Sequence, residues 1–102
     1  MKLEKIAHIK TPSSRPKWMT THLANPIARV MDSSIVRIYC NVRNQANQTH
    51  IIYLDIDFTN HYEITYFHRE PLLSLGPIGA FDDSGQSLGC IITRDNKDYL
   101  YY

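Results

Sequence analysis

At 102 residues, the chain is long enough to bury the core of one small domain and too short for two. Hydrophobic residues make up 43% and charged residues 21%, values that argue against disorder and against a coiled coil. Eleven Lys and Arg residues against ten Asp and Glu residues leave a formal charge of +1, so we expect no nucleic-acid partner. No run of about 18 apolar residues is present, and we therefore expect neither a membrane segment nor a secretion signal.

The chain is expected to be all-β, because apolar residues recur mainly at every second position. Near the amino terminus, residues 2–10 are expected to form an isolated strand. Residues 11–17, with two prolines, read as a linker-like loop. Residues 27–31 are expected to form the innermost strand of an antiparallel meander.

The clearest alternation covers Ile35–Arg43, the second strand of the meander. One face of this strand carries Arg37, Tyr39, Asn41 and Arg43. The opposite face carries Val36, Ile38, Cys40 and Val42. The next strand, at residues 50–57, repeats the pattern after a polar hairpin loop at residues 44–49.

A third strand of this group is expected at residues 62–68, before Pro71 stops regular pairing. All four glycines fall within residues 75–89, which predicts a long shaped loop. Two further strands, residues 90–93 and 98–102, flank a turn and predict a second hairpin.

Two cysteines, Cys40 and Cys90, lie in apolar strand-like runs. This setting favours buried free thiols over a disulfide or a metal pair, and with it a cytoplasmic location. The five histidines lack paired ligand spacing, so no metal and no cofactor are expected.

Several motifs together have the look of a known family. They are His22-x-x-Asn25-Pro26, Val36-Arg37-Ile38-Tyr39-x-x-Val42-Arg43, Gly79-Ala80-Phe81-Asp82-Asp83-Ser84-Gly85 and Tyr99-Leu100-Tyr101-Tyr102. In this order the chain resembles the amino-terminal part of bacterial five-bladed β-propeller proteins related to the arabinanase and xylosidase glycoside hydrolases. The resemblance implies a single partial propeller domain over residues 1–102. Residues 1–74 would form the first blade with the strand that leads into it, and residues 75–102 a loop and the start of the second blade.

The resemblance also implies a funnel at one end of the propeller axis, where carboxylates from several blades act on a glycosidic bond. Asp82 and Asp83 are then the candidate catalytic residues. Their alternative interpretation is an Asx-type turn, in which an aspartate binds its own backbone. Where the hydrolases carry an aspartate before proline in the first blade, this chain has Asn25, an amide that cannot act as base or nucleophile.

Five residues are candidates for binding the substrate. His22 and Asn25 would face the funnel, Arg37 and Arg43 could line a carbohydrate groove, and Trp18 could stack on a sugar ring. Each has a plainer alternative. His22 could be a loop histidine without a ligand, the arginines could belong to a solvated sheet face or an interblade contact, and Trp18 could anchor a loop.

Two functions follow from the sequence. In the first, the chain belongs to a longer protein that hydrolyses or binds glycans. In the second, it is a non-catalytic sugar-binding or assembly module that forms homo-oligomers, or associates with the remaining blades, to complete the propeller. An incomplete propeller exposes strand edges and apolar interblade faces, which is why the second hypothesis predicts association.

Overall fold

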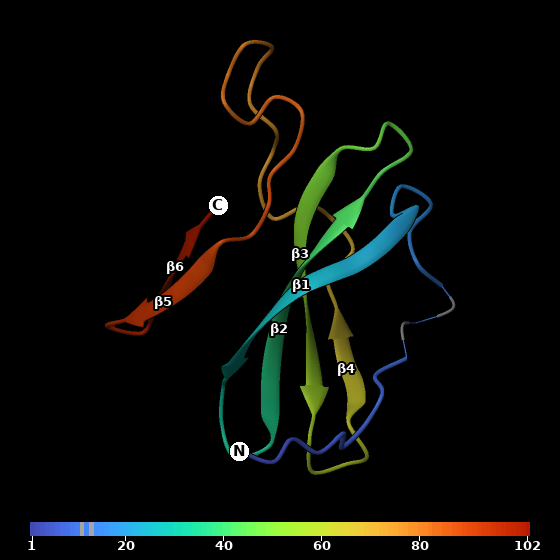
Figure 1. Cartoon of the computed structure of the whole chain (residues 1–102), viewed down its shortest axis with the longest axis vertical. Helices are drawn as coiled ribbons and strands as arrows, with labels where there is room; N and C mark the ends of the chain where they lie inside the picture. The colour runs from blue at the N-terminus through green and yellow to red at the C-terminus, as the bar shows by residue number, and fades with distance from the viewer. Residues whose placement is uncertain (11, 13) are drawn as a thin grey trace.

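The chain folds into two antiparallel sheets in a computed structural model that describes residues 1–10, 12 and 14–102 (Figure 1). The first sheet has the order β1-β2-β3-β4, and the second pairs β5 with β6. The strands are β1 (Thr21–Val30), β2 (Ile35–Arg43), β3 (Thr49–Asp57), β4 (Glu63–Phe67), β5 (Cys90–Arg94) and β6 (Lys97–Tyr101). The prediction of antiparallel, all-β meander sheets is confirmed. The described part of the chain holds no helix able to cross a membrane.

The central hairpin, β2–β3, is the most regular part of the fold. Its nine residue pairs run without a break from Ile35 and Asp57 to Arg43 and Thr49. The loop between the strands closes on Asn44, whose side-chain oxygen accepts a hydrogen bond from the Gln48 backbone at 2.9 Å. Both predicted strands of this hairpin are confirmed, because strict alternation fixes the register when a face is buried.

The first strand is longer than predicted. It begins at Thr21 and not at residue 27, and its pairing with β2 shifts register twice, between Thr21 and Ala24 and again between Ala24 and Ile27. His22 and Asn25 lie in these irregular stretches. A bulge adds an unpaired residue to a strand, so the apolar alternation on which the prediction depended is lost there.

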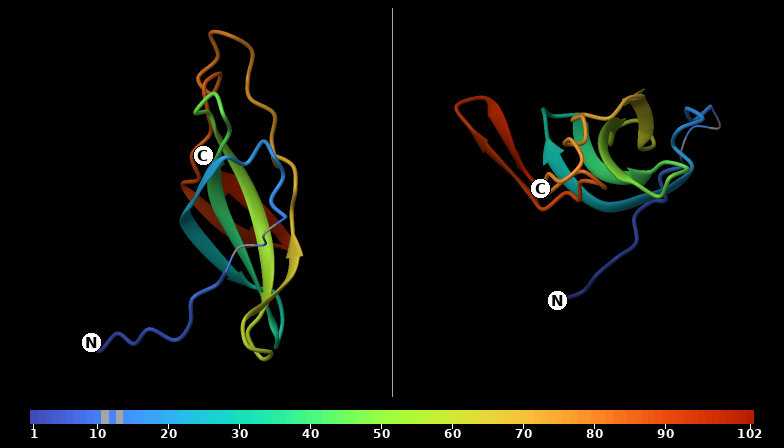
Figure 2. Two further views of the ribbon diagram at one scale, coloured as in Figure 1. Left: turned by 90° about the vertical axis from the view of Figure 1, so that its right-hand side faces the viewer. Right: turned by 90° about the horizontal axis from the view of Figure 1, so that it is seen from above.

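The prediction of a strand at residues 2–10 is wrong. The segment runs extended and pairs with no strand of the described residues (Figure 2). Its apolar side chains Met1, Leu3 and Ile6 are exposed, so their burial offsets none of the cost of ordering the segment. In the predicted linker at 11–17, Thr11 and Ser13 lie outside the described residues. The strand predicted at 62–68 forms as Glu63–Phe67, because Tyr62 has a left-handed backbone (φ 56°).

The central hairpin packs on both faces, whereas alternation by itself predicts one buried and one solvated face. On the face that we call the apolar face, Cys40, Val42 and Ile52 pack against Met19, with Trp18, Leu23 and Phe67 at the margin. On the other, which we call the polar face, Tyr39 and Ile51 pack against Leu88 from the long loop.

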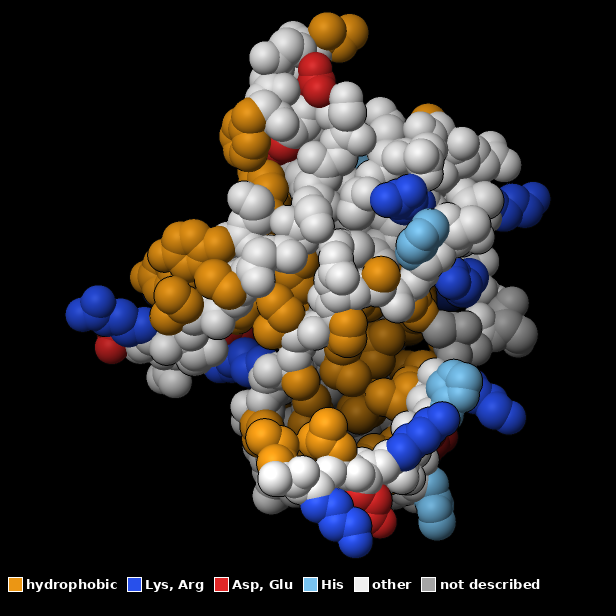
Figure 3. All heavy atoms as spheres, in the orientation of Figure 1, with side chains coloured by type: hydrophobic (Ala, Val, Ile, Leu, Met, Phe, Trp, Pro, Cys, Tyr) orange, Lys and Arg blue, Asp and Glu red, His pale blue; other side chains and the backbone are white. Residues whose placement is uncertain are grey.

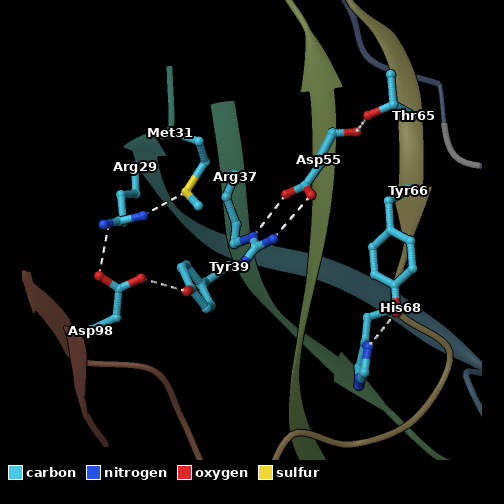
Figure 4. Close-up of polar contacts among 9 residues, drawn as sticks. All are labelled: Arg29, Met31, Arg37, Tyr39, Asp55, Thr65, Tyr66, His68 and Asp98. Carbon is cyan, nitrogen blue, oxygen red and sulfur yellow. Dashed lines mark hydrogen bonds and ion pairs between the residues drawn. The ribbon is translucent and has the colours of Figure 1, made fainter. Parts of the chain in front are cut away.

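The hairpin β5–β6 docks on the polar face through Asp98 (Figure 4). The Asp98 carboxylate accepts a hydrogen bond from the Tyr39 hydroxyl at 3.0 Å and pairs with Arg29 Nε at 2.7 Å. Burial, followed by the contact with Asp98, raises the pKa of Tyr39. Ile91 and Leu100 add apolar contacts beside these polar ones.

The prediction that both thiols are buried is wrong for Cys90, which is exposed, whereas Cys40 is buried. Side chains alternate along β5, so Ile91 faces the first sheet and Cys90 faces away from it. The outward side of this hairpin is unusually apolar. Its exposed members are Ile92, Tyr99 and Tyr101.

A second apolar area lies on the first sheet. A hollow of about 230 Å³ opens on its apolar face, and Figure 3 shows apolar side chains gathered in a hollow of the surface. The residues that line it are Ile9, Leu23, Pro26, Ile38, Cys40 and Leu54.

The two thiols should differ in reactivity. Burial raises the pKa of the Cys40 thiol to about 11, so little thiolate forms near pH 8. We expect iodoacetamide to alkylate Cys90 in the native protein and Cys40 only after unfolding in guanidinium, as followed by peptide mass spectrometry. The variant Cys90→Ser serves as the control and should show no fast labelling. Equal rates at both native thiols would contradict this packing.

The docking of the second hairpin should depend on Asp98. Asp98→Ala removes the acceptor of the Tyr39 hydroxyl and the carboxylate partner of Arg29, and we expect it to lower the free energy of unfolding by about 1–3 kcal/mol. The matched control is Asp95→Asn, which removes the exposed 3.8 Å ion pair with Arg94 but tolerates the left-handed backbone of this turn position (φ 52°), and should change stability by less than about 0.5 kcal/mol. Urea unfolding measures both. Equal losses in the two variants would show that the Asp98 contacts do not hold the hairpin.

Candidate functional site

A polar pocket lies where the start of β1 meets the end of β2 and the long loop. Its cavity measures about 90 Å³. The lining residues are His22, Ala24, Asn25, Asn41, Arg43, Thr49 and Ser87. Three of the five residues proposed from the sequence as substrate-binding therefore come together here: His22, Asn25 and Arg43.

The two irregular stretches of β1 shape one wall of this pocket. His22 and Asn25 have left-handed backbones, with φ of 68° and 51°. Such a conformation is uncommon outside glycine, although Asn and His adopt it more readily than most residues. Bulges change the direction in which side chains point at a strand edge, and the two irregular stretches of β1 place His22 and Asn25 at the pocket. The His22 carbonyl also accepts a hydrogen bond from Arg15 Nη2 at 2.9 Å, which ties the strand to the preceding loop.

The floor of the pocket is fixed by Asn41, a buried residue of β2. Its amide nitrogen donates to the Ser87 hydroxyl at 3.2 Å, and its oxygen accepts from the Leu88 backbone at 3.0 Å. These contacts hold the long loop against the sheet. Gly85 allows the loop to lie this close to β3, because a Cβ atom at this position would lie 2.9 Å from the Thr49 backbone nitrogen.

Arg43 brings positive charge to the pocket. One of its terminal nitrogens, Nη1, donates to the Asn47 side-chain oxygen at 3.0 Å. No aspartate or glutamate lines the pocket. The arrangement can donate hydrogen bonds and attract an anion, but a pair of carboxylates for acid and base catalysis must come from elsewhere.

Arg37 and Trp18 lie outside this pocket. Arg37 forms a two-pronged ion pair with Asp55, at 2.9 and 3.1 Å, and its guanidinium lies 4.2 Å from the centre of the Tyr53 ring (Figure 4). The hydrogen bond with Asp55 raises the pKa of Arg37. Trp18 donates to the Arg69 carbonyl at 2.8 Å and packs at the margin of the core, as a loop anchor would.

The aspartate pair of the long loop also lies outside the pocket. Asp82 is buried and accepts hydrogen bonds from Gln86 at 3.0 Å and from the Tyr102 hydroxyl at 3.2 Å. Asp83 accepts from the Gly79 backbone at 2.8 Å, and this bond lowers the pKa of its carboxyl group. Both aspartates thus have structural partners within the loop. A side chain at Gly76 would collide with the Asp82 carboxylate, so the loop closes tightly around it.

Sequence reasoning missed four lining residues, Ala24 and the polar residues Asn41, Thr49 and Ser87. Asn41 was placed on the polar face of its strand, but its burial depends on a loop 46 residues away. Ser87 gives no signal, since serine is common in loops. Within the described part of the chain, no group of three or more His, Cys, Asp or Glu residues is placed to hold a metal ion.

The chain is similar to two curated proteins of Mycobacterium tuberculosis. They are the "Uncharacterized protein MT1551" of strain CDC 1551 / Oshkosh and the "Uncharacterized protein Rv1502" of strain H37Rv. Each is 32% identical over 102 residues, which is 100% of this chain and 34% of the relative. The chain therefore spans about a third of the length of these relatives. No family model and no solved structure matches it.

The two aspartates of the loop should differ in their contribution to stability. Asp82→Ala removes one of the two acceptors of the buried Gln86 amide and the acceptor of the Tyr102 hydroxyl, and we expect it to lower the free energy of unfolding by about 1–3 kcal/mol. Asp83→Ala, in the same loop, should cause a much smaller loss because its carboxylate is exposed to water. Thermal unfolding of the two variants checks this. A larger loss for Asp83→Ala would contradict the contacts described for the loop.

Proposed function

We propose that the chain is the first blade and the beginning of the second blade of a carbohydrate-binding, five-bladed β-propeller, and that the polar pocket forms part of its sugar site. The observation that carries the proposal is the backbone of β1. Two left-handed, irregular residues of this edge strand, His22 and Asn25, line a polar pocket. Strained backbone of this kind gathers at functional sites.

The packing of the two sheets supports the propeller. A four-stranded meander is followed by a second hairpin that lies against its face (Figures 1 and 2). Arg29 of β1 donates to Thr93 of β5 at 2.8 Å, and Tyr39 of β2 donates to Asp98 of β6. Arg29 also pairs with Asp98 of β6, so the first two strands of the first sheet both contact the second hairpin. Packing of one sheet on the next is the contact that neighbouring propeller blades require.

The two open apolar areas support the same architecture. One is the hollow on the apolar face of the first sheet, and the other is the outward side of β5–β6. They lie on the sides that adjacent blades would cover in a closed ring. The relatives are about three times as long as the chain, which gives room for such blades. Under this proposal residues 1–74 form the first blade with the strand that leads into it, and residues 75–102 form the loop and the start of the second blade.

The pocket favours binding over hydrolysis by this chain. Amide, imidazole, guanidinium and hydroxyl groups suit the hydroxyls of a sugar. Asn25 occupies the position at which the hydrolases carry an aspartate, and both Asp82 and Asp83 are engaged within their own loop. Any hydrolysis would therefore depend on carboxylates supplied by further blades.

The second candidate is an assembly module that completes the ring with further copies of itself. The exposure of Ile92, Tyr99 and Tyr101 favours association of some kind. We prefer blades of the same polypeptide as the covering partner, because the relatives carry the additional length within one chain.

Binding can be tested with variants that keep the backbone of β1. Glycine adopts a left-handed backbone without strain, so His22→Gly and Asn25→Gly remove only the side chains. The ligands are arabino- and xylo-oligosaccharides, and the readout is the shift of backbone amide signals in NMR spectra. We expect each variant to weaken binding roughly two- to tenfold, about 0.5–1.4 kcal/mol for one lost hydrogen bond.

The matched control is Asn96→Gly. Asn96 also has a left-handed backbone (φ 60°) but lies in the turn between β5 and β6, so its replacement should leave binding unchanged. Sugar-induced shifts that avoid the pocket amides, or an equal effect of all three variants, would overturn the proposal.

A further inference from the structure

The charged side chain that lines the polar pocket is a cation. Arg43 contributes a guanidinium group, and the other polar lining residues are neutral amides, hydroxyls and an imidazole. Among the described residues, the pocket lining thus holds one guanidinium group and no carboxylate.

Arg43 differs in this respect from the other arginines of the polar face. Arg29 is paired with Asp98 at 2.7 Å, and Arg37 with Asp55 at 2.9 Å. Among the ion pairs of the described residues, Arg43 takes part in none, and its side-chain partner is the neutral amide of Asn47. A guanidinium that lines a pocket without a carboxylate partner is a ready site for an anion.

The size of the cavity limits what can enter. About 90 Å³ is roughly three times the volume of one water molecule in the liquid, ~30 Å³. This space suits a substituent of a few heavy atoms and is too small for a whole pyranose ring. A carboxylate or phosphate group has the right size, and its oxygens match the planar fork of a guanidinium.

We propose that the pocket binds the negatively charged substituent of an acidic sugar, with Arg43 as the residue that selects for the charge. This inference rests on the proposed function, because it names the class of sugar that the same pocket would take. The shared chemistry is an oxyanion carried by a sugar, either the carboxylate of a uronic acid or the phosphate of a sugar phosphate. Asn25 and Ser87 supply neutral polar groups around it.

The test compares sugars with and without an anionic group at carbon 6. Glucuronate is paired with glucose, galacturonate with galactose, and glucose 6-phosphate with both glucose and inorganic phosphate. Binding is followed by the shifts of the pocket amides in NMR spectra at low and high salt. We expect at least one acidic sugar to bind about tenfold or more tightly than its neutral counterpart, and the preference to shrink as salt rises.

Variants then assign the preference to one side chain. Arg43→Gln should abolish the preference, so that the acidic sugar binds no more tightly than its neutral counterpart. Arg94→Gln makes the same change of net charge on the exposed β5–β6 hairpin and should preserve the preference. Arg43→Lys keeps the charge but lacks the planar guanidinium, so its preference for the acidic sugar should lie between those of the unchanged protein and Arg43→Gln. This variant also tests the inference if Arg43→Gln fails to fold.

The outcomes separate the two proposals. If neutral and acidic sugars bind the pocket equally, the inference is wrong and the proposed sugar site stands. If no sugar binds but inorganic phosphate shifts the pocket amides, the pocket holds a free anion only, and both the proposed sugar site and the inference are wrong. If Arg94→Gln weakens the preference as much as Arg43→Gln does, net charge explains the effect and the inference is overturned.

Discussion

The fold depends on a central hairpin whose two faces must both be covered. Val42, Ile51 and Ile52 of β2–β3 have no exposed surface at all, although they lie on opposite sides of the sheet. A single layer of strands cannot exclude water from both faces. The segment around Met19 therefore packs on the apolar face, and the long loop with the second hairpin packs on the polar face. The remaining elements take their positions from this requirement.

Covering the polar face requires that its hydrogen-bonding groups be satisfied, since an unpaired buried polar group is costly. Asn41 meets the requirement by holding the loop at Ser87 and Leu88, and Tyr39 meets it through Asp98. The same contacts position the wall of the polar pocket. Asn41 thus both satisfies the buried face and holds the loop that lines the pocket.

The sequence predicts the regular parts of this fold well and the irregular parts poorly. Period-two alternation locates β2 and β3 to within a residue, because their register is unbroken. It fails at Thr21–Val30, where two shifts of register disrupt the period, and at residues 2–10, whose apolar residues find no sheet to join. At the pocket, motifs pointed to His22, Asn25 and Arg43. The contribution of Ser87 arises from a contact between distant segments, which no local pattern contains.

The irregular backbone of β1 serves a purpose beyond aiming side chains. β1 is an edge strand, and an edge with free backbone groups invites pairing with another chain. Two shifts of register and Pro26, which lacks an N–H donor, make the strand a poor template for such pairing. Asn25 adopts the left-handed conformation at moderate cost, and its amide then lines the pocket. The irregular backbone of β1 therefore makes the edge a poor template for a further strand and places His22 and Asn25 at the pocket.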